Sequence, residues 1–533
     1  MTSQMNEESK RGCLLCERRE FLKQMGLLMG GLAVPTGVMA RFGDHSGHGI
    51  AKDKTGAVKV RLVFSIWDDI QVRKTWPNVG YDFRNVLTYI TDRLNEGVEG
   101  VQFIPGKAYD AATVDAILAE DAKAGDIAGY MVIQMNSWPD SAKNIANKTD
   151  KPLLFCSYNY SGIGGWCTVN SSILRSKRKG YAFISSLSFE DTVGAARAFA
   201  ALKDGTPEDF VKAATDYRLA HTPAPSQFKL KAGHTKCLTP DETLGKIKGF
   251  KILSVERDRP DLFEKIRKDF GIEVEAVPFE ILNSYARNAD GKLAEKLARK
   301  WKNKAQYVEA VTDETLLGCA KLFYGMKNIL ADKKAQAITV NCLGGCYTGK
   351  LDSYPCLGFM QLQDEGLFGV CEDDLESTVT MMVFNAMTKG LMGYVSDPAI
   401  DSSHRAIVYA HCVSTRRFFG PKGKEYPYEI LTHSEDRMGA SVRAIAPAAY
   451  PVTTVKFNIY TGKMAVHTGV VTGNDPDDRA CRTKIVAEVI GDYEKIYRQW
   501  DAFKWHRVTF LGDFAEEAEA FAKHIGYTVV KES

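Results

Sequence analysis

Apolar and polar positions in the first two thirds of the chain follow the pattern of strands that alternate with helices. Runs rich in β-branched residues at 58–66 and 127–134 are each followed by a segment in which apolar residues have helical spacing. Such alternation predicts parallel sheets covered by helices on both faces. The pattern stops at a glycine-rich turn, 162–165, and then resumes. We therefore predict two Rossmann-like, doubly wound units, 57–172 and 173–352.

The last third of the chain has a different pattern. A long apolar helix is predicted at 375–389, and the β-branched runs that follow it are separated by turns. Strands separated in this way predict an antiparallel or mixed sheet. The predicted fold is therefore α/β, with the two doubly wound units followed by a mixed α/β C-terminal domain at 353–533. The strand predicted at 181–187 is assigned to the second of the two units.

The N-terminus contains a segment unlike the rest of the chain. Arg18 and Arg19 are followed by Phe-Leu-Lys and then by an apolar, glycine-rich stretch, 25–40. This arrangement resembles a twin-arginine export signal, and it predicts a signal peptide at 1–40, a polar linker at 41–56 and export to the periplasm. The alternative is a buried or membrane-anchoring N-terminal helix.

Charge and cysteine usage narrow the possible partners and cross-links. The 533 residues carry a formal net charge of +3, with acidic and basic side chains interspersed. Nucleic-acid binding needs a concentrated basic face, so a nucleic-acid partner is not expected. The 12 cysteines are spread along the chain. Cys342 and Cys346 could form a disulfide or remain buried thiols, and no pairing is predicted.

Three adjacent carboxylates, Glu372, Asp373 and Asp374, lie where an apolar strand meets an apolar helix. Neighbouring carboxylates repel one another unless a cation or hydrogen-bond donors compensate their charge. An aspartate in the last two positions can also cap the N-terminus of the helix. We expect both: an aspartate caps the helix, and Glu372, on the strand side, faces inward as a candidate metal ligand.

Two further polar residues stand beside apolar segments later in the chain. Asp397 precedes Pro398, which is expected to end its segment, and the ordinary place of such an aspartate is a turn. His506 precedes a predicted strand at 508–511, where a histidine is more often packed and hydrogen-bonded than bound to a metal. Taken alone, neither residue identifies a site.

Taken together, three segments carry a family resemblance. The sequences GVCEDDL, GLMGYVSD and KWHRVTFLGD, in this order, resemble the L-fucose isomerase/L-arabinose isomerase-like family. The resemblance implies that Glu372, Asp397 and His506 bind one Mn²⁺ (or Mg²⁺) ion, and the oxygen-rich character of this set suits those ions. It also implies the two Rossmann-like units and a homo-oligomer, either a trimer or a hexamer.

The same resemblance implies an activity. This activity is aldose–ketose isomerisation of a carbohydrate or polyhydroxy-ketone through an enediolate, with Glu372 and Asp397 also serving as the acid/base pair. The candidates for binding the substrate are Trp67, His411 and His433. Two other functions stay open: a metal-dependent lyase or hydrolase that acts on a hydroxy-ketone or cyclic ketone, and an exported sugar-binding protein without catalysis.

Overall fold

Five parallel strands form the first sheet of the computed structural model, which describes residues 56–533. Their order is β2-β1-β3-β4-β5, so the strand order reverses between β1 and β3. Ligands of open parallel sheets bind at such a reversal, beyond the carboxyl ends of the strands. The strands are β1 (Val58–Ser65), β2 (Val101–Ala108), β3 (Ile127–Gln134), β4 (Leu153–Ser157) and β5 (Tyr181–Ile184).

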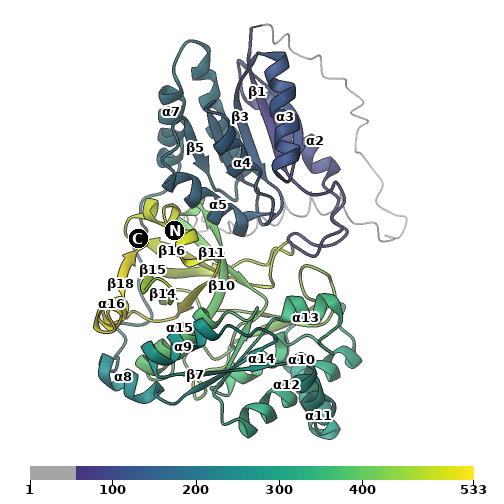
Figure 1. The fold of residues 1–533 in the computed structure, drawn as a ribbon, viewed down its shortest axis with the longest axis vertical. Helices are drawn as coiled ribbons and strands as arrows, with labels where there is room; N and C mark the ends of the chain where they lie inside the picture. The colour runs from purple at the N-terminus through teal and green to yellow at the C-terminus, as the bar shows by residue number, and fades with distance from the viewer. Residues whose placement is uncertain (1–55) are drawn as a thin grey trace, which may run out of the picture. The chain divides into compact units, whose positions relative to one another are not determined.

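Helices pack against this sheet, as the alternating pattern predicts (Figure 1). They are α2 (Arg84–Gly97), α3 (Ala111–Ala124), α4 (Ser141–Lys148), α5 (Ile163–Arg175), α6 (Phe189–Ala196) and α7 (Pro207–Ala220), together with the 3-10 helix η2 (Arg197–Lys203).

A second parallel sheet has the order β7-β6-β8-β9, and here the strand order reverses between β6 and β8. Its strands are β6 (Lys251–Val255), β7 (Glu273–Val277), β8 (Ala337–Val340) and β9 (Phe368–Cys371). The helices of this part are α8 (Pro240–Ile247), α9 (Pro260–Phe270), α10 (Phe279–Arg287), α11 (Gly291–Lys304), α12 (Asp313–Asp332), α13 (Cys342–Thr348), α14 (Cys356–Asp364) and α15 (Leu375–Met387).

The two sheets divide the chain at other places than the pattern predicts. Strand β5, predicted for the second unit, pairs with β4 and belongs to the first sheet. Strand β9 lies beyond the predicted limit at residue 352 but is the edge strand of the second sheet. Local periodicity identifies a strand without identifying its partner, because strand pairing depends on contacts between distant segments.

The C-terminal part forms a closed antiparallel barrel. Its strands pair in the order β14-β17-β10-β11-β16-β15, and β14 also pairs with β15, which closes the ring. Strand β18 adds to β15 in parallel, and β12 pairs with β13 apart from the ring. The strands are β10 (Tyr394–Asp401), β11 (Ala406–His411), β12 (Tyr428–Leu431), β13 (Ser441–Ala444), β14 (Pro451–Asn458), β15 (Lys463–Asn474), β16 (Thr483–Ile490), β17 (Arg507–Phe510) and β18 (Thr528–Lys531).

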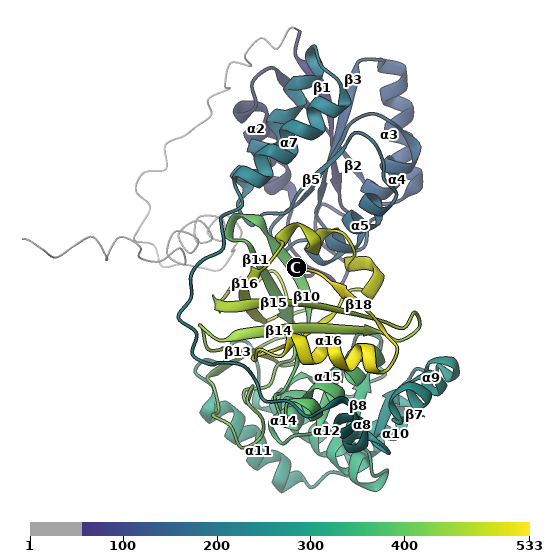
Figure 2. The same cartoon turned by 90° about the vertical axis from the view of Figure 1, so that its left-hand side faces the viewer.

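Short helices accompany the barrel, and Figure 2 shows α16 beside the ring. They are α16 (Ala515–His524) and the 3-10 helices η3 (Ser402–His404), η4 (Tyr493–Tyr497) and η5 (Trp500–Phe503).

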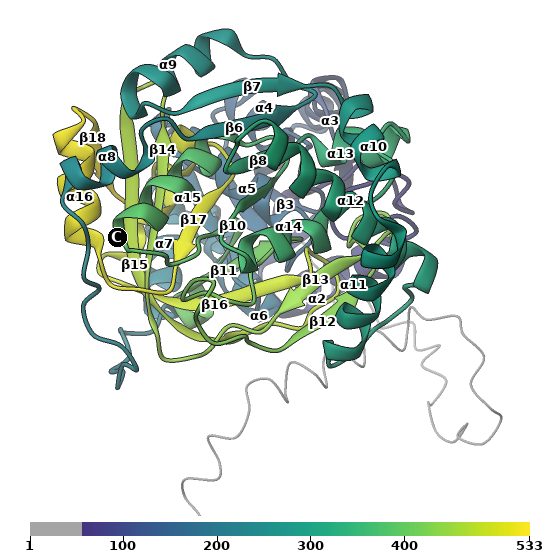
Figure 3. The ribbon, with the colours of Figure 1, turned by 90° about the horizontal axis from the view of Figure 1, so that it is seen from below.

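Helix α15 connects the second sheet to the barrel. It packs on β9 and also on β14 and β17 (Figure 3). The ring of Phe384 stacks on that of Phe457 in β14, with centroids 5.4 Å apart. Every residue of the helix except Asn385 is buried, and burial on all sides explains why its apolar residues are not confined to one face. The helix predicted at 375–389 is therefore confirmed, with its end at Met387.

Residues 56–533 belong to one compact unit, and α5 of the first sheet contacts β10 of the barrel. No helix within these residues has the length and apolar character needed to span a membrane. The predicted signal peptide, and all but the last residue of the predicted linker, lie outside the described residues. Export therefore stays a prediction.

Candidate metal centre

A cavity of about 370 Å³ lies where the carboxyl ends of both parallel sheets meet the barrel. This is the position at which open parallel sheets bind their ligands. Residues from all three parts of the fold line it: Thr75, Trp76, Ser137, Trp138, Gly164, Arg257, Arg259, Asn341, Leu343, Glu372, Asp373, Asp374, Asp397, Glu435, Lys504, Trp505 and His506.

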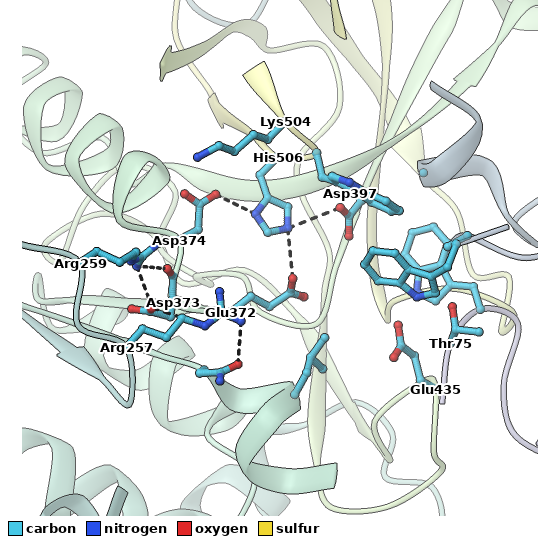
Figure 4. Close-up of a pocket in the computed structure, with 17 residues that line it drawn as sticks. Thr75, Arg257, Arg259, Glu372, Asp373, Asp374, Asp397, Glu435, Lys504 and His506 are labelled. Carbon is cyan, nitrogen blue, oxygen red and sulfur yellow. Dashed lines mark hydrogen bonds and ion pairs between the residues drawn. The ribbon is translucent and has the colours of Figure 1, made fainter. Parts of the chain in front are cut away.

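Glu372 is the first residue after β9, and its backbone is strained. Glu372 (φ 65°) and Asp373 (φ 53°) both adopt the left-handed conformation, which costs a residue other than glycine about 1–3 kcal/mol. Asp373 is held there by two donors at 2.7 Å, Arg259 Nη2 and Ser254 Oγ. The two residues turn the chain so that the Glu372 carboxylate points into the cavity (Figure 4). Backbone strain of this kind clusters at functional sites.

Asp374 caps helix α15, as predicted. Its Oδ1 accepts a hydrogen bond from the backbone N–H of Ser377 at 2.9 Å. Its Oδ2 accepts from Lys456 Nζ at 2.7 Å and from His506 Nδ1 at 2.9 Å. Although burial raises the pKa of Asp374, the charges of Lys456 and His506 bring it well below its usual value. The ionised carboxylate therefore orients a helix and an imidazole at once.

Strand register in the barrel brings three side chains together. The pairing of β10 with β17, continued by one residue, places Asp397 across from His506. On its other side β10 pairs with β11, where Asp397 lies opposite Ala410, the residue before His411. Neighbouring strands lie roughly 4.7–4.9 Å apart, so side chains at these positions can reach one another.

Asp397 lies within a strand and not in a turn. The predicted end of its segment at Pro398 is wrong, because β10 continues to Asp401. Proline lacks an N–H and is tolerated where one side of a strand has no partner. Strand β17 pairs with β10 only as far as Ser396, so from Pro398 onward β11 is the one neighbour of β10 in the ring.

The imidazole of His506 faces carboxylates with both of its nitrogens. Because an ionised carboxylate only accepts hydrogen bonds, Nδ1 carries the proton shared with Asp374. Nε2 faces the cavity, 3.4 Å from Asp397 Oδ1 and 3.6 Å from Glu372 Oε2. Neighbouring ligands of one divalent ion lie roughly 3 Å apart, since each is roughly 2.1 Å from the ion. Nε2 of His506 thus lies between the other two predicted ligands, Glu372 and Asp397 (Figure 4).

His411 joins this group from the neighbouring strand. Its Nε2 lies 3.7 Å from Glu372 Oε1, and one ligand atom each of Glu372, His411 and His506 lie within 4.8 Å of one another. Its side chain is buried, and neither ring nitrogen has a hydrogen-bond partner among residues 56–533. A buried polar atom without a partner costs roughly 1–3 kcal/mol. Coordination of an ion accounts for both the burial of His411 and the missing partner of one nitrogen.

Burial and nearby charges shift the titration of these groups. Burial raises the pKa of Asp397 to about 7. For His506 the effect of burial is outweighed by the charge of Asp397 and the hydrogen bond to Asp374, so that its pKa rises to about 9. Burial and the charges of neighbouring histidines hold the pKa of His411 well below its usual value. His411 is therefore neutral at pH 7 and can offer a lone pair to a cation.

Glu435 is a further carboxylate of the cavity, and it lies beside Thr75 (Figure 4). It accepts a hydrogen bond from the hydroxyl of Tyr347, and burial raises its pKa to about 7. Asp373 and Asp374 are paired with Arg259 and Lys456. Glu435 forms no ion pair with a lysine or arginine in the described part of the chain, so its carboxylate is available to a ligand.

An aromatic pair forms part of the cavity wall. The ring centroids of Trp138 and Trp505 lie 4.7 Å apart, and 58% of Trp138 is exposed. Gly164 makes room for this pair, because a Cβ atom at that position would lie 3.1 Å from the Trp505 ring. Aromatic faces beside a few polar groups are typical of pockets that bind small molecules.

None of the three predicted substrate-binding residues lines the cavity. The ring of Trp67 packs on Tyr109 at 5.2 Å, with the guanidinium of Arg73 over its face. His433 lies in a small adjoining pocket, and its Nδ1 is 3.3 Å from Asp436 Oδ1. The third, His411, lies with the predicted metal ligands.

Three features of the site are not predicted from the sequence. The contact of Asp374 with His506 has no local signal, because helix capping already accounts for the aspartate. Glu435 stands in the polar segment His-Ser-Glu-Asp. The density of charged groups in this segment is a sequence feature from which a functional residue could have been predicted. Trp138 follows a predicted strand, and the carboxyl ends of such strands are where ligands bind.

Comparisons with known proteins give a partial match. No family model matches the chain. A segment of 101 residues is 23% identical to the sulfoquinovose isomerase of Alkalicoccus urumqiensis, which covers 19% of this chain and 23% of the relative. The sulfoquinovose isomerase of Priestia megaterium is 24% identical over 101 residues, covering 19% and 22%. The matches thus span less than a quarter of these relatives.

Among solved structures, a solute-binding protein of an ABC transporter system from Aeropyrum pernix K1 is 12% identical. The superposition covers 55% of this chain and 65% of that one, with a TM-score of 0.16. A score this low carries no argument about fold or function.

Proposed function

We propose that this protein is a metal-dependent isomerase that interconverts an aldose and a ketose. The observation that carries the proposal is the position of His506 between the carboxylates of Glu372 and Asp397 in the cavity wall, with the unpartnered His411 near Glu372 and His506. The similarity of one segment to sulfoquinovose isomerases supports this class of reaction. From the family resemblance we also propose a homo-oligomer, and from the twin-arginine-like segment we propose export.

Four side chains would hold the ion, which we propose to be Mn²⁺ or Mg²⁺: those of Glu372, Asp397, His411 and His506. Two carboxylates and two imidazoles leave positions open for substrate oxygens and suit these ions. The donor set fits, because His411 is neutral and its ring nitrogens lack other partners. When bound, the ion supplies a Lewis acid that polarises the substrate carbonyl.

The chain itself supplies the groups that move protons and position the sugar. Isomerisation transfers one hydrogen between C1 and C2 and one between the oxygens on these carbons. Glu372 and Asp397 face each other across His506, so that one carboxylate can remove a proton while the other returns one. Glu435 can accept a hydrogen bond from a sugar hydroxyl at the opposite wall, and the Trp138–Trp505 pair can pack against the apolar face of the sugar.

A substrate screen tests this proposal. Protein loaded with Mn²⁺ is incubated with a panel of aldoses and ketoses, and the products are identified by NMR and mass spectrometry. We expect one sugar to convert to an isomer of unchanged mass, and Glu372→Gln to abolish the conversion. Products of altered mass would instead identify a lyase or hydrolase. Binding of a sugar without any turnover would identify a sugar-binding protein.

A further inference from the structure

Two buried thiols face each other behind the proposed metal centre. The Sγ atom of Cys412 lies 3.0 Å from that of Cys481, about 1 Å more than the length of a disulfide bond. The residues are 4% and 5% exposed, and both thiols are free. A small movement of either side chain therefore closes the distance.

The two cysteines lie at the ends of paired strands. Cys412 follows β11 and Cys481 precedes β16, and these strands are antiparallel neighbours with His411 opposite Thr483. Continuing the register past this pair places Cys412 opposite Arg482, so Cys412 and Cys481 are diagonal neighbours at the strand ends. Their side chains bring the two sulfur atoms to 3.0 Å from each other across this diagonal.

We propose that Cys412 and Cys481 form a disulfide in an oxidising compartment, the environment that the twin-arginine-like segment predicts. Cys412 reacts first: its side chain lines a pocket of only about 10 Å³ beside Glu372 and His411, so the reagent reaches it when the strand ends open locally. Its thiolate attacks one sulfur of a small disulfide and expels one thiol. Cys481 then attacks the Cys412 sulfur and expels the second thiol. Two protein thiols lose two hydrogens, and the small disulfide becomes two thiols.

The disulfide would link two segments that contribute to the site. Cys412 is adjacent to His411, and Cys481 is adjacent to Arg482, whose Nε donates a hydrogen bond to the carbonyl oxygen of Thr432 at 2.7 Å. Thr432 begins the segment that carries Glu435. The cross-link spans 69 positions of the chain, and closure of such a segment stabilises the folded state by restricting the unfolded chain.

The test treats reduced, full-length protein with bis(2-hydroxyethyl) disulfide, alkylates the remaining thiols in denaturant and maps the peptides. We expect two fewer alkylated cysteines, a peptide pair that joins Cys412 to Cys481, and a rise in Tm of several degrees that a phosphine reductant reverses. Cys481→Ser should remove the cross-link, whereas Cys167→Ser, at another buried thiol, should keep it.

Two results would overturn the proposal. One is an unchanged thiol count in the native chain. The other is a cross-link elsewhere, above all at Cys371, whose thiol interacts with those of Cys342 and Cys356. The peptide map of the unmutated protein decides between these outcomes even if Cys481→Ser fails to fold.

Discussion

The Oδ2 atom of Asp374 lies 2.9 Å from Nδ1 of His506 and so joins a helix cap to an imidazole. The same carboxylate caps α15 through its other oxygen, and α15 is buried between the second sheet and the barrel. The orientation of His506 is therefore tied to the packing of the core. Contacts between a carboxylate and a metal-binding histidine fix the ring and its tautomer.

Asp374→Asn should weaken metal binding without loss of the helix. Asparagine caps helices about as well as aspartate, but it lacks the charge that orients His506. We expect Mn²⁺ affinity, measured by calorimetry, to fall by about 10- to 100-fold, with an unchanged far-ultraviolet circular dichroism spectrum. An affinity equal to that of the unmutated protein would show that this contact does not support the centre.

Metal addition should stabilise the protein through Glu372. An ion that binds only the folded state at 100 times its Kd adds about 2.7 kcal/mol to the free energy of unfolding. We expect Mn²⁺ to raise Tm and EDTA to reverse the rise. Glu372→Gln should abolish the effect, whereas Glu280→Gln, at an exposed side chain, should leave it intact. A rise of equal size in Glu372→Gln would place the ion elsewhere.

His411→Phe should separate metal binding from folding. Phenylalanine fills a similar space without the two unpartnered ring nitrogens, so the metal-free protein should be as stable as before or more stable, by about 1 kcal/mol. The rise in Tm with Mn²⁺ should shrink or vanish.

The matched control for this substitution is His433→Phe. His433 is also buried but faces Asp436, so its loss leaves a carboxylate short of a partner and should cost about 1–3 kcal/mol in urea denaturation. Equal destabilisation by the two substitutions would contradict the assignment of His411 as a ligand.

Metal affinity should rise with pH. In the metal-free protein the pKa of Asp397 is raised to about 7 by burial and that of His506 to about 9 by Asp397 and Asp374, which outweigh burial. Both groups must lose their protons to bind an ion, so protons compete with the metal below these values. We expect the apparent Mn²⁺ affinity to increase from about pH 6 to about pH 9, with protons released on binding. Calorimetry in buffers of different ionisation enthalpy measures that release, and an affinity independent of pH would contradict the ligand set.

Glu435→Gln should lower turnover and leave the metal in place. Glu435 lines the cavity but is not one of the four proposed ligands, and an amide keeps its size while losing its charge. We expect Mn²⁺ affinity to change less than twofold and kcat for the substrate found by the screen to fall about 10-fold or more. A parallel loss of metal would show that Glu435 belongs to the centre itself.

Much of the fold is predictable from local pattern, and the exceptions are non-local. The helix at α15 and most strands follow from periodicity, because the spacing of apolar residues is a property of one segment. The sheet to which β5 belongs depends on its pairing with β4, and the closure of the barrel depends on the pairing of β14 with β15. No single segment carries that information.

The candidate site likewise contains residues that local motifs predict and residues whose positions depend on contacts between distant segments. The sequence motifs place Glu372, Asp397 and His506 in one site, and the structure brings them together. The position of His411 depends on the register that sets Ala410 opposite Asp397, which is invisible in the sequence. Trp67 follows β1 at the expected edge of the first sheet, yet its ring packs on Tyr109 and not in the cavity.

The residues that line the cavity fall into two groups, which come from different parts of the chain. The proposed ion ligands come from the end of β9 and from the barrel, whereas Thr75, Trp76, Ser137 and Trp138 come from loops of the first sheet. Loops accept substitutions more readily than core strands do. The residues proposed to carry the reaction and those that face the substrate from the loops therefore lie in different segments. Substitutions in two loops could change the substrate while the reaction stays the same.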